Sequence, residues 1–185
     1  MGLLQSIASL DPPQGAATGS DRGPGVHPSD NLGSMANAMP QALGAQALDR
    51  GREVVAFCGD GALTMLLGDL LTAVHHQLPV RLVVFNNGRL GMVKLQQEQA
   101  GLPEFGTRLQ DVNLAAIAAA AGLHAIRVTD PDTLDESIRT AFAHPGPVLL
   151  DVVTNPVSLP PKVKPGQAWG FAIAKLTETL ESRGS

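Results

Sequence analysis

The chain has 185 residues and a mass of 19.2 kDa, which allows one domain with a sizeable core rather than two. Hydrophobic residues make up 44% of the sequence and aromatic residues only 3%, so the core must consist mainly of Ala, Leu and Val. Such a core suits a parallel sheet covered by Ala-rich helices. The formal charge is −4 and the basic residues are scattered, which argues against a nucleic acid partner.

The single cysteine, Cys58, excludes an internal disulfide and a Cys-based zinc site. This cysteine usage is typical of a reducing compartment. No apolar run approaches the roughly 20 residues that span a bilayer, and the first residues lack the pattern of a signal peptide. We therefore expect a cytoplasmic protein without a membrane segment.

Residues 1–31 contain five Gly and four Pro and show no helical or strand periodicity. Segments of this composition have little apolar surface to offset the entropy lost on ordering. We predict a flexible, disordered leader over residues 1–31 and one folded domain over residues 32–185.

Buried parallel strands are predicted where short runs are apolar on both faces. These runs cover residues 54–58, 82–85 and 148–153, with a shorter one at 124–128. Between the first two runs, a helix beginning at Ala62 is predicted because apolar residues recur at helical spacing. Its apolar stripe is Leu63, Leu66, Leu67, Leu70 and Val74.

A second helix is predicted from Asp130, which suits the N-cap position, and Pro131, which suits the first helical position. Its apolar residues are Leu134, Ile138, Ala141 and Phe142. Strands that alternate with crossover helices predict an α/β fold: a doubly wound, mostly parallel sheet with helices on both faces. Ligands of such sheets bind at the carboxyl ends of the strands.

Polar loops follow two successive predicted strands, and in a parallel sheet both loops emerge at the same edge. Asp60 offers a carboxylate and Asn87 an amide oxygen, which are ligands suited to Mg²⁺. Magnesium with so few protein ligands usually completes its shell with water and phosphate, so a diphosphate is the expected ligand. Gly59 and Gly61 would let the backbone approach it, and the helix from Ala62 would direct N–H groups towards it.

Taken alone, Gly59-Asp60-Gly61 is more typical of a tight turn than of a site. Here the tripeptide is followed after 24 residues by Asn86-Asn87, which resembles the signature of thiamine-diphosphate enzymes. Over about residues 32–171 the chain is similar to the C-terminal domain of the pyruvate oxidase and quinone-dependent pyruvate dehydrogenase family. The resemblance implies a thiamine-diphosphate-binding fold.

The same resemblance assigns roles to individual residues. Asp60 and Asn87 would bind Mg²⁺ through their side chains, and Arg89 would bind it through its main-chain carbonyl. The main-chain carbonyl of Gly33 would accept a hydrogen bond from the cofactor's amino group, and Met35 would hold the cofactor in a bent conformation. The remaining implied cofactor contacts are Ser34, Gly59, Gly61, Ala62, Gly88, Leu90, Gly91, Met92 and Val93. Gln96 stands where a glutamate is expected.

In the family, the activating glutamate belongs to a pyrimidine-binding domain and FAD to a middle domain, and the chain shows neither. The resemblance therefore implies a 2-oxo acid substrate such as pyruvate, a pyrimidine-binding domain as partner, and a homo-oligomer when complete. We expect the chain alone to be inactive and to be a fragment, and the leader raises the hypothesis that the first βα unit is missing.

Three alternatives remain. An acetolactate-synthase-type carboligase shares the diphosphate motif, and a non-catalytic remnant could bind the cofactor without turnover. A phospho-accepting receiver domain also places an Asp after a strand. That domain needs an acidic pair after its first strand and a lysine late in the sheet, and the sequence has neither arrangement.

Overall fold

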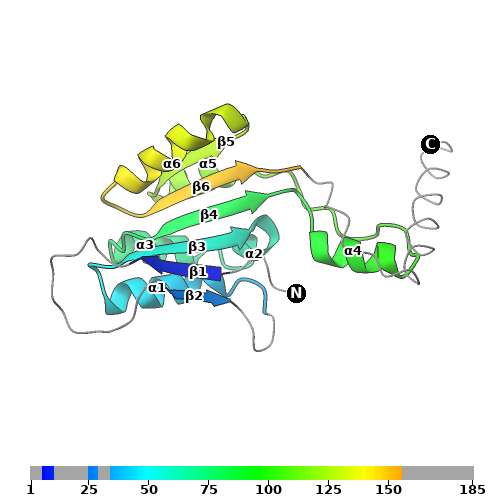
Figure 1. Cartoon of the computed structure of the whole chain (residues 1–185), viewed down its shortest axis with the longest axis horizontal. Helices are drawn as coiled ribbons and strands as arrows, with labels where there is room; N and C mark the ends of the chain where they lie inside the picture. The colour runs from blue at the N-terminus through cyan, green and yellow to red at the C-terminus, as the bar shows by residue number, and fades with distance from the viewer. Residues whose placement is uncertain (1–5, 11–24, 29–33, 156–185) are drawn as a thin grey trace. The chain divides into compact units, whose positions relative to one another are not determined.

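The computed structural model describes residues 6–10, 25–28 and 34–155 (Figure 1). The chain divides into two compact units. The first unit is Met1–Asn86 with Val112–Thr154, and the second is Asn87–Asp111 with Asn155–Ser185. The predicted site residues belong to both units.

The first unit is built on one sheet of six strands in the order β2-β1-β3-β4-β6-β5. Strands β3, β4, β6 and β5 run parallel to their neighbours, and β1 and β2 add an antiparallel edge. This arrangement confirms the predicted mostly parallel α/β sheet. The bounds of the strands are β1 Ser6–Leu10, β2 Gly25–Pro28, β3 Glu53–Gly59, β4 Arg81–Asn86, β5 His124–Val128 and β6 Val148–Val153.

The antiparallel edge corrects the prediction for residues 1–31 at two places. Strand β1 pairs with β3 over five residues, and β2 pairs with β1 over four. Neither segment shows a strand pattern of its own, so the pairing comes from the exposed edge of β3, which offers unpaired backbone groups to any neighbouring extended segment. The domain boundary at residue 32 stays a prediction.

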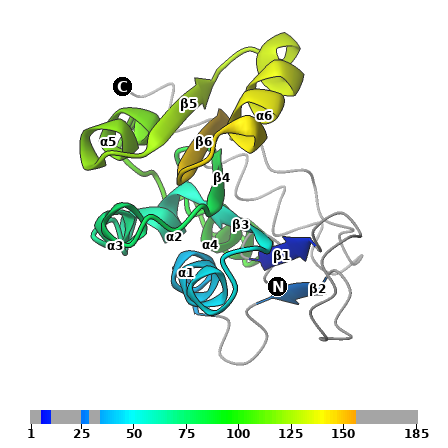
Figure 2. The same cartoon turned by 90° about the vertical axis from the view of Figure 1, so that its left-hand side faces the viewer.

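Helices cover both faces of the sheet, as Figure 2 shows. Helices α1, α3 and α5 pack on one face and α6 on the other. The main apolar cluster lies between the sheet and helices α1, α3 and α5, and it includes Met39, Leu70, Leu82 and Leu149. The bounds are α1 Ala38–Leu48, α2 Asp60–Thr64, α3 Asp69–His75, α5 Leu114–Ala121 and α6 Leu134–Ala143.

The single helix predicted after β3 is wrong in two respects. It begins at Asp60 rather than Ala62, and it is interrupted by a turn over residues 65–68, so that α2 and α3 replace it. Backbone bonds in the turn span three residues, and Gly68, a weak helix former, lies at its end. The turn leaves Leu66 39% exposed, while Leu63 and Leu70 stay buried in the core.

The prediction for Asp130 and Pro131 is confirmed with one refinement. The Asp130 carboxylate accepts a hydrogen bond from the Asp132 N–H at 3.0 Å, and Pro131 opens a short 3₁₀ turn, Pro131–Thr133. Helix α6 follows directly at Leu134. The cap therefore acts on the 3₁₀ turn that leads into α6.

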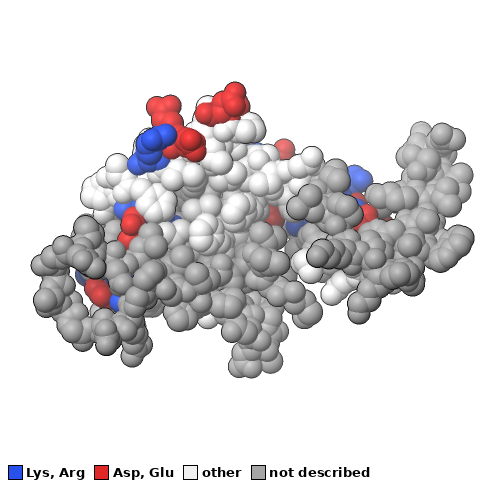
Figure 3. Space-filling view, viewed as in Figure 1, with Lys and Arg blue, Asp and Glu red and all other residues white. Residues whose placement is uncertain are grey.

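Within the described ranges, no helix has the length and apolar character needed to cross a membrane. On the face shown in Figure 3, the charged side chains of these residues do not gather into a patch of one sign. On α6, the exposed side chains of Asp135 and Arg139 form an ion pair.

Candidate functional site

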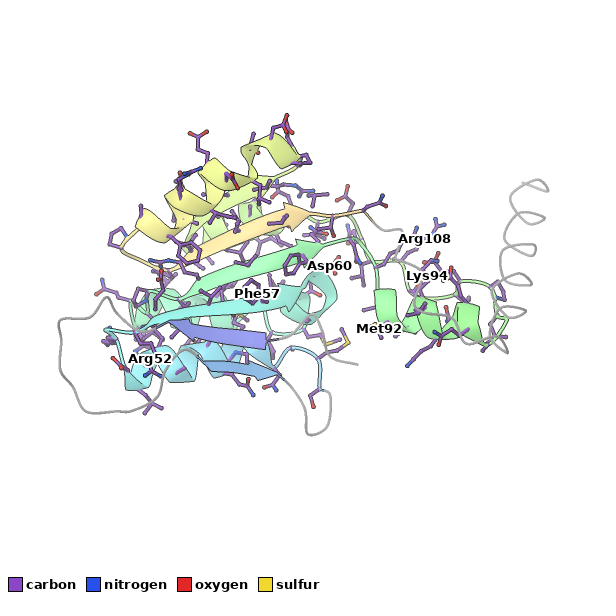
Figure 4. The ribbon with its side chains drawn as sticks, viewed as in Figure 1. Arg52, Phe57, Asp60, Met92, Lys94 and Arg108 are labelled. Carbon is purple, nitrogen blue, oxygen red and sulfur yellow. The ribbon has the colours of Figure 1, made fainter. Side chains whose placement is uncertain are left out.

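Asp60 lies at the carboxyl end of β3, where the predicted fold places ligands (Figure 4). Gly59 is in register with Phe85 of the parallel neighbour β4, so Asp60 and Asn86 follow at the same edge of the sheet. The Asp60 side chain is only 6% exposed, and its Oδ1 accepts a hydrogen bond from the Gly61 N–H at 2.8 Å. A buried carboxylate is therefore oriented at this edge by its own backbone.

The backbone beside Asp60 is open on one side. A Cβ placed on Gly59 would meet no atom within 4 Å, so a phosphate group could approach the chain closely there. Gly61 and Ala62 are buried in the first turn of α2. That helix has only five residues, so the strong helix-end contribution predicted from a long helix is not available at this point.

A buried polar network at the same edge escaped the sequence analysis. Asp151 of β6 has no exposed surface, and its carboxylate accepts hydrogen bonds from Asn86 Nδ2 at 3.0 Å and from the Leu114 N–H at 3.2 Å. Arg127 of β5 lies 3.5 Å from the same carboxylate. Asn86 also donates to the Val112 carbonyl at 3.3 Å. The end of β4, directly before Asn87, is thus fixed to β6 and to the start of α5.

In the second unit, Asn87 and Gly88 form a tight turn. The Asn87 Oδ1 accepts from the Arg89 N–H at 3.0 Å, and an amide oxygen keeps a second lone pair for a metal ion. Gly88 has φ +65°, a left-handed conformation that favours glycine, and a Cβ there would meet no atom within 4 Å. The turn is therefore compatible with the predicted metal and phosphate contacts.

The Arg89 side chain is held by Glu104, with which it forms an ion pair. Glu104 also accepts a hydrogen bond from the Thr107 hydroxyl at 2.6 Å. Burial acts to raise the pKa of Glu104, but the bonds from Thr107 and Arg89 and the charges of Arg89 and Lys94 outweigh it and hold this pKa below its ordinary value. The pair therefore contributes stability that is present above the ordinary carboxyl pKa and is lost as pH falls through the lowered one.

Helix α4, Gly91–Gln99, follows this turn and carries the last predicted cofactor contacts. Met92 is 47% exposed and Val93 41%, so both apolar side chains are accessible. Lys94 and Glu98 form an ion pair within the helix. Gln96 is exposed.

The structure groups the predicted residues in two sets. Residues 59–62 lie in the first unit, and residues 87–93 lie in the second. Ser34 and Met35 precede α1 in the first unit and are exposed, whereas Gly33 lies outside the described residues. Across the described ranges, no three His, Cys, Asp or Glu side chains gather at a possible metal site. The predicted ligand set contains only one such side chain, Asp60, and its convergence with Asn87 on one ion stays a prediction.

The sheet and its site edge define an α/β domain of the kind that binds a ligand at strand ends. The model of the C-terminal thiamine pyrophosphate binding domain of thiamine pyrophosphate enzymes matches residues 15–152, and thiamine pyrophosphate is the same compound as thiamine diphosphate. This match covers more than half of the chain. The chain therefore belongs to the C-terminal binding domain family of the thiamine pyrophosphate enzymes.

Individual relatives include a thiamine pyrophosphate-containing protein and large subunits of acetolactate synthase. YdaP of Bacillus subtilis, named as a thiamine pyrophosphate-containing protein, is 36% identical over 153 residues, which are 82% of this chain and 27% of YdaP. The large subunit of acetolactate synthase isozyme 2 from Escherichia coli K12 is 31% identical over 152 residues, 80% of this chain and 28% of that subunit.

A third relative, the acetolactate synthase large subunit of Porphyra purpurea, is 33% identical over 144 residues, 76% of this chain and 24% of that subunit. The chain thus spans about a quarter of the length of the relatives it matches. These relatives support the family, and they do not single out the pyruvate oxidase type.

Proposed function

We propose that this chain holds thiamine diphosphate through Mg²⁺ as the C-terminal domain of an enzyme acting on 2-oxo acids. The supporting observation is the buried Asp60 carboxylate at the end of β3, beside the parallel strand that leads directly into Asn87. The Asp60 and Asn87 side chains and the Arg89 carbonyl would supply the protein oxygens, which is a donor set suited to Mg²⁺.

The residues of the chain fit such a group. Gly59 leaves its backbone uncovered, and Gly88 does the same in the Asn87 turn, so both loops can accept a diphosphate at close range. The accessible apolar side chains of Met35, Met92 and Val93 are suited to contact the rings of the cofactor. When bound, thiamine diphosphate supplies the chemistry of decarboxylation, and the protein supplies position and electrostatics.

Two reactions are compatible with this proposal. A pyruvate-decarboxylating oxidoreductase of the pyruvate oxidase type is supported by the resemblance of residues 32–171 to that family, and it would pass electrons to FAD held by another domain. A carboligase of the acetolactate synthase type is favoured by the relatives with that name. We give both equal weight, and in either case a pyrimidine-binding domain would be the partner.

We expect thiamine diphosphate to bind this chain only in the presence of a divalent ion, because Asp60 and Asn87 would reach the diphosphate through the metal. Isothermal titration with Mg²⁺ and after treatment with EDTA measures this dependence. Equal affinity in the two conditions would contradict the proposed geometry. Cofactor binding without turnover under any condition would favour the non-catalytic remnant.

We also expect the chain alone to release no CO₂ from pyruvate, even with excess thiamine diphosphate and Mg²⁺, because the family's activating glutamate belongs to the pyrimidine-binding domain. Mixing the chain with a pyrimidine-binding domain from a relative tests the need for that partner. With activity restored, electron transfer to a dye acceptor identifies the oxidoreductase, and formation of acetolactate identifies the carboligase. Turnover by the chain alone would overturn this expectation.

A further inference from the structure

Polar contacts join distant parts of the segment 87–111. The structure describes every residue of this segment, and Glu98 and Thr107 are the residues in it that are buried as a whole. Its large apolar side chains Met92, Val93, Leu102 and Phe105 are exposed. Apolar burial is usually the main source of order in a protein. The hydrogen bonds and ion pairs described within the segment depend on a few specific residues.

Glu104 is the centre of these polar contacts. Its Oε1 takes the ion pair with Arg89 and the hydroxyl hydrogen bond from Thr107, while Arg108 lies 4.0 Å from its Oε2. The Glu104 side chain is 9% exposed and that of Arg89 is 19% exposed, so water screens this pair less than a surface pair. The Arg108 side chain is 78% exposed, and its contribution is correspondingly small.

Backbone hydrogen bonds join the same two stretches of chain. The Leu90 N–H donates to the Thr107 carbonyl at 2.8 Å, and the Leu109 N–H donates to the Gly88 carbonyl at 2.9 Å. Between these bonds, Arg89 and Arg108 form an antiparallel bridge. The Arg89–Glu104 pair therefore closes a clamp in which residues 104–109 hold the turn formed by residues 87–90.

We propose that Glu104 is a positioning residue that fixes the main chain of Arg89 for metal binding, an inference that rests on the proposed function. The Arg89 guanidinium is engaged by Glu104, so its task is to anchor the turn rather than to neutralise a diphosphate. The Arg89 side chain is held by Glu104, and the N–H of the same peptide group as the Arg89 carbonyl, that of Leu90, is held by the Thr107 carbonyl. The Arg89 carbonyl therefore has little freedom to change its direction.

The test is Mg²⁺ titration of the whole chain at fixed thiamine diphosphate, comparing the wild type with Glu104→Gln. Glutamine keeps the shape of the side chain and removes its charge, so the Kd for Mg²⁺ should rise by roughly tenfold, as expected for loss of a strong coupling between neighbouring residues. The exposed pair Arg139–Asp135 on α6 provides the matched control, and Asp135→Asn should leave the Kd unchanged.

A charge swap separates positioning from general damage to the fold. The double variant Arg89→Glu with Glu104→Arg rebuilds the pair in reverse and leaves the Arg89 main-chain carbonyl in place, so it should recover most of the lost Mg²⁺ affinity. Amide hydrogen exchange at Leu90 and Leu109 gives a reading without any ligand. Both amides should exchange faster in Glu104→Gln than in the wild type.

The possible outcomes distinguish the two proposals. If the wild type binds Mg²⁺ and the cofactor but Glu104→Gln binds them equally well, the positioning role is refuted and the proposed function stands. If Glu104→Gln binds Mg²⁺ more weakly than the wild type and the charge swap recovers none of the lost affinity, the Arg89–Glu104 pair is not the anchor and the inference fails. A wild type that binds no metal overturns the proposed function and this inference together.

Discussion

Replacing Asp60 by alanine is expected to weaken metal-dependent binding of thiamine diphosphate by more than about 100-fold. Mutation of a residue that only hydrogen-bonds to a metal ligand already lowers metal affinity by up to about 100-fold, and Asp60 is proposed to be a ligand itself. Asp60 is the one carboxylate in the proposed ligand set, and a backbone carbonyl and an amide cannot replace its charge. Asp60→Asn keeps the shape of the side chain but not its charge, and it should weaken metal-dependent cofactor binding almost as much as Asp60→Ala.

The fold should survive this change. Asp60 lies at the end of β3, outside the apolar cluster under α1, α3 and α5, and its carboxylate bonds to the N–H of the adjacent Gly61. Alanine also favours the helix that begins at this position. Circular dichroism and the thermal unfolding midpoint would check the fold, and isothermal titration would check binding.

Asp69→Ala is the matched control, since Asp69 is another carboxylate in the first turn of a helix, α3, and is not a proposed ligand. It should bind the cofactor like the wild type. A folded Asp60→Ala variant with unchanged affinity would exclude the metal role of Asp60.

The parallel strands of the fold could be predicted because each is a short apolar run with turn residues at its ends. Strands β5 and β6 begin and end where the sequence indicates, and β3 and β4 extend one residue beyond the predicted runs at each end. The position of Asp60 at a strand end followed from the same pattern. Helix α5 could not be predicted this way, because its sequence LAAIAAAA has no polar stripe to reveal a helical period.

The polar networks were beyond sequence reasoning for a different reason. Asn86 meets Asp151, which is 65 positions away in the chain, and Asp151 meets the N–H of Leu114 at a separation of 37. Asp151 stands inside an apolar run, where period and composition indicate only a buried strand. Glu104 looks like a solvated loop residue until the Arg89 turn is folded against it. A charge inside a predicted buried strand was the one available signal.

The second large expected effect is a loss of stability when Asp151 is replaced. Asp151 is fully buried, accepts hydrogen bonds from Asn86 and the Leu114 N–H, and pairs with Arg127, whose side chain is 24% exposed. Asp151→Ala removes all three contacts and should lower the free energy of unfolding by about 3–5 kcal/mol. Asp151→Asn keeps an acceptor oxygen but turns an NH₂ group towards other donors. It should lose less, about 1–3 kcal/mol. Urea unfolding followed by circular dichroism measures both values.

The variant Arg127→Leu shows whether the charge pair or the hydrogen bonds dominate. Arg127 lies 3.5 Å from the Asp151 carboxylate. If this ion pair dominates, the double variant Asp151→Ala with Arg127→Leu should lose less free energy of unfolding than the sum of the losses in the two single variants. Additive losses would instead assign the stability to the bonds from Asn86 and the Leu114 N–H. Asp135→Ala, which breaks an exposed pair, should change stability by less than about 1 kcal/mol. A loss for Asp151→Ala no larger than this control would mean that the network at the end of β4 adds nothing to the fold.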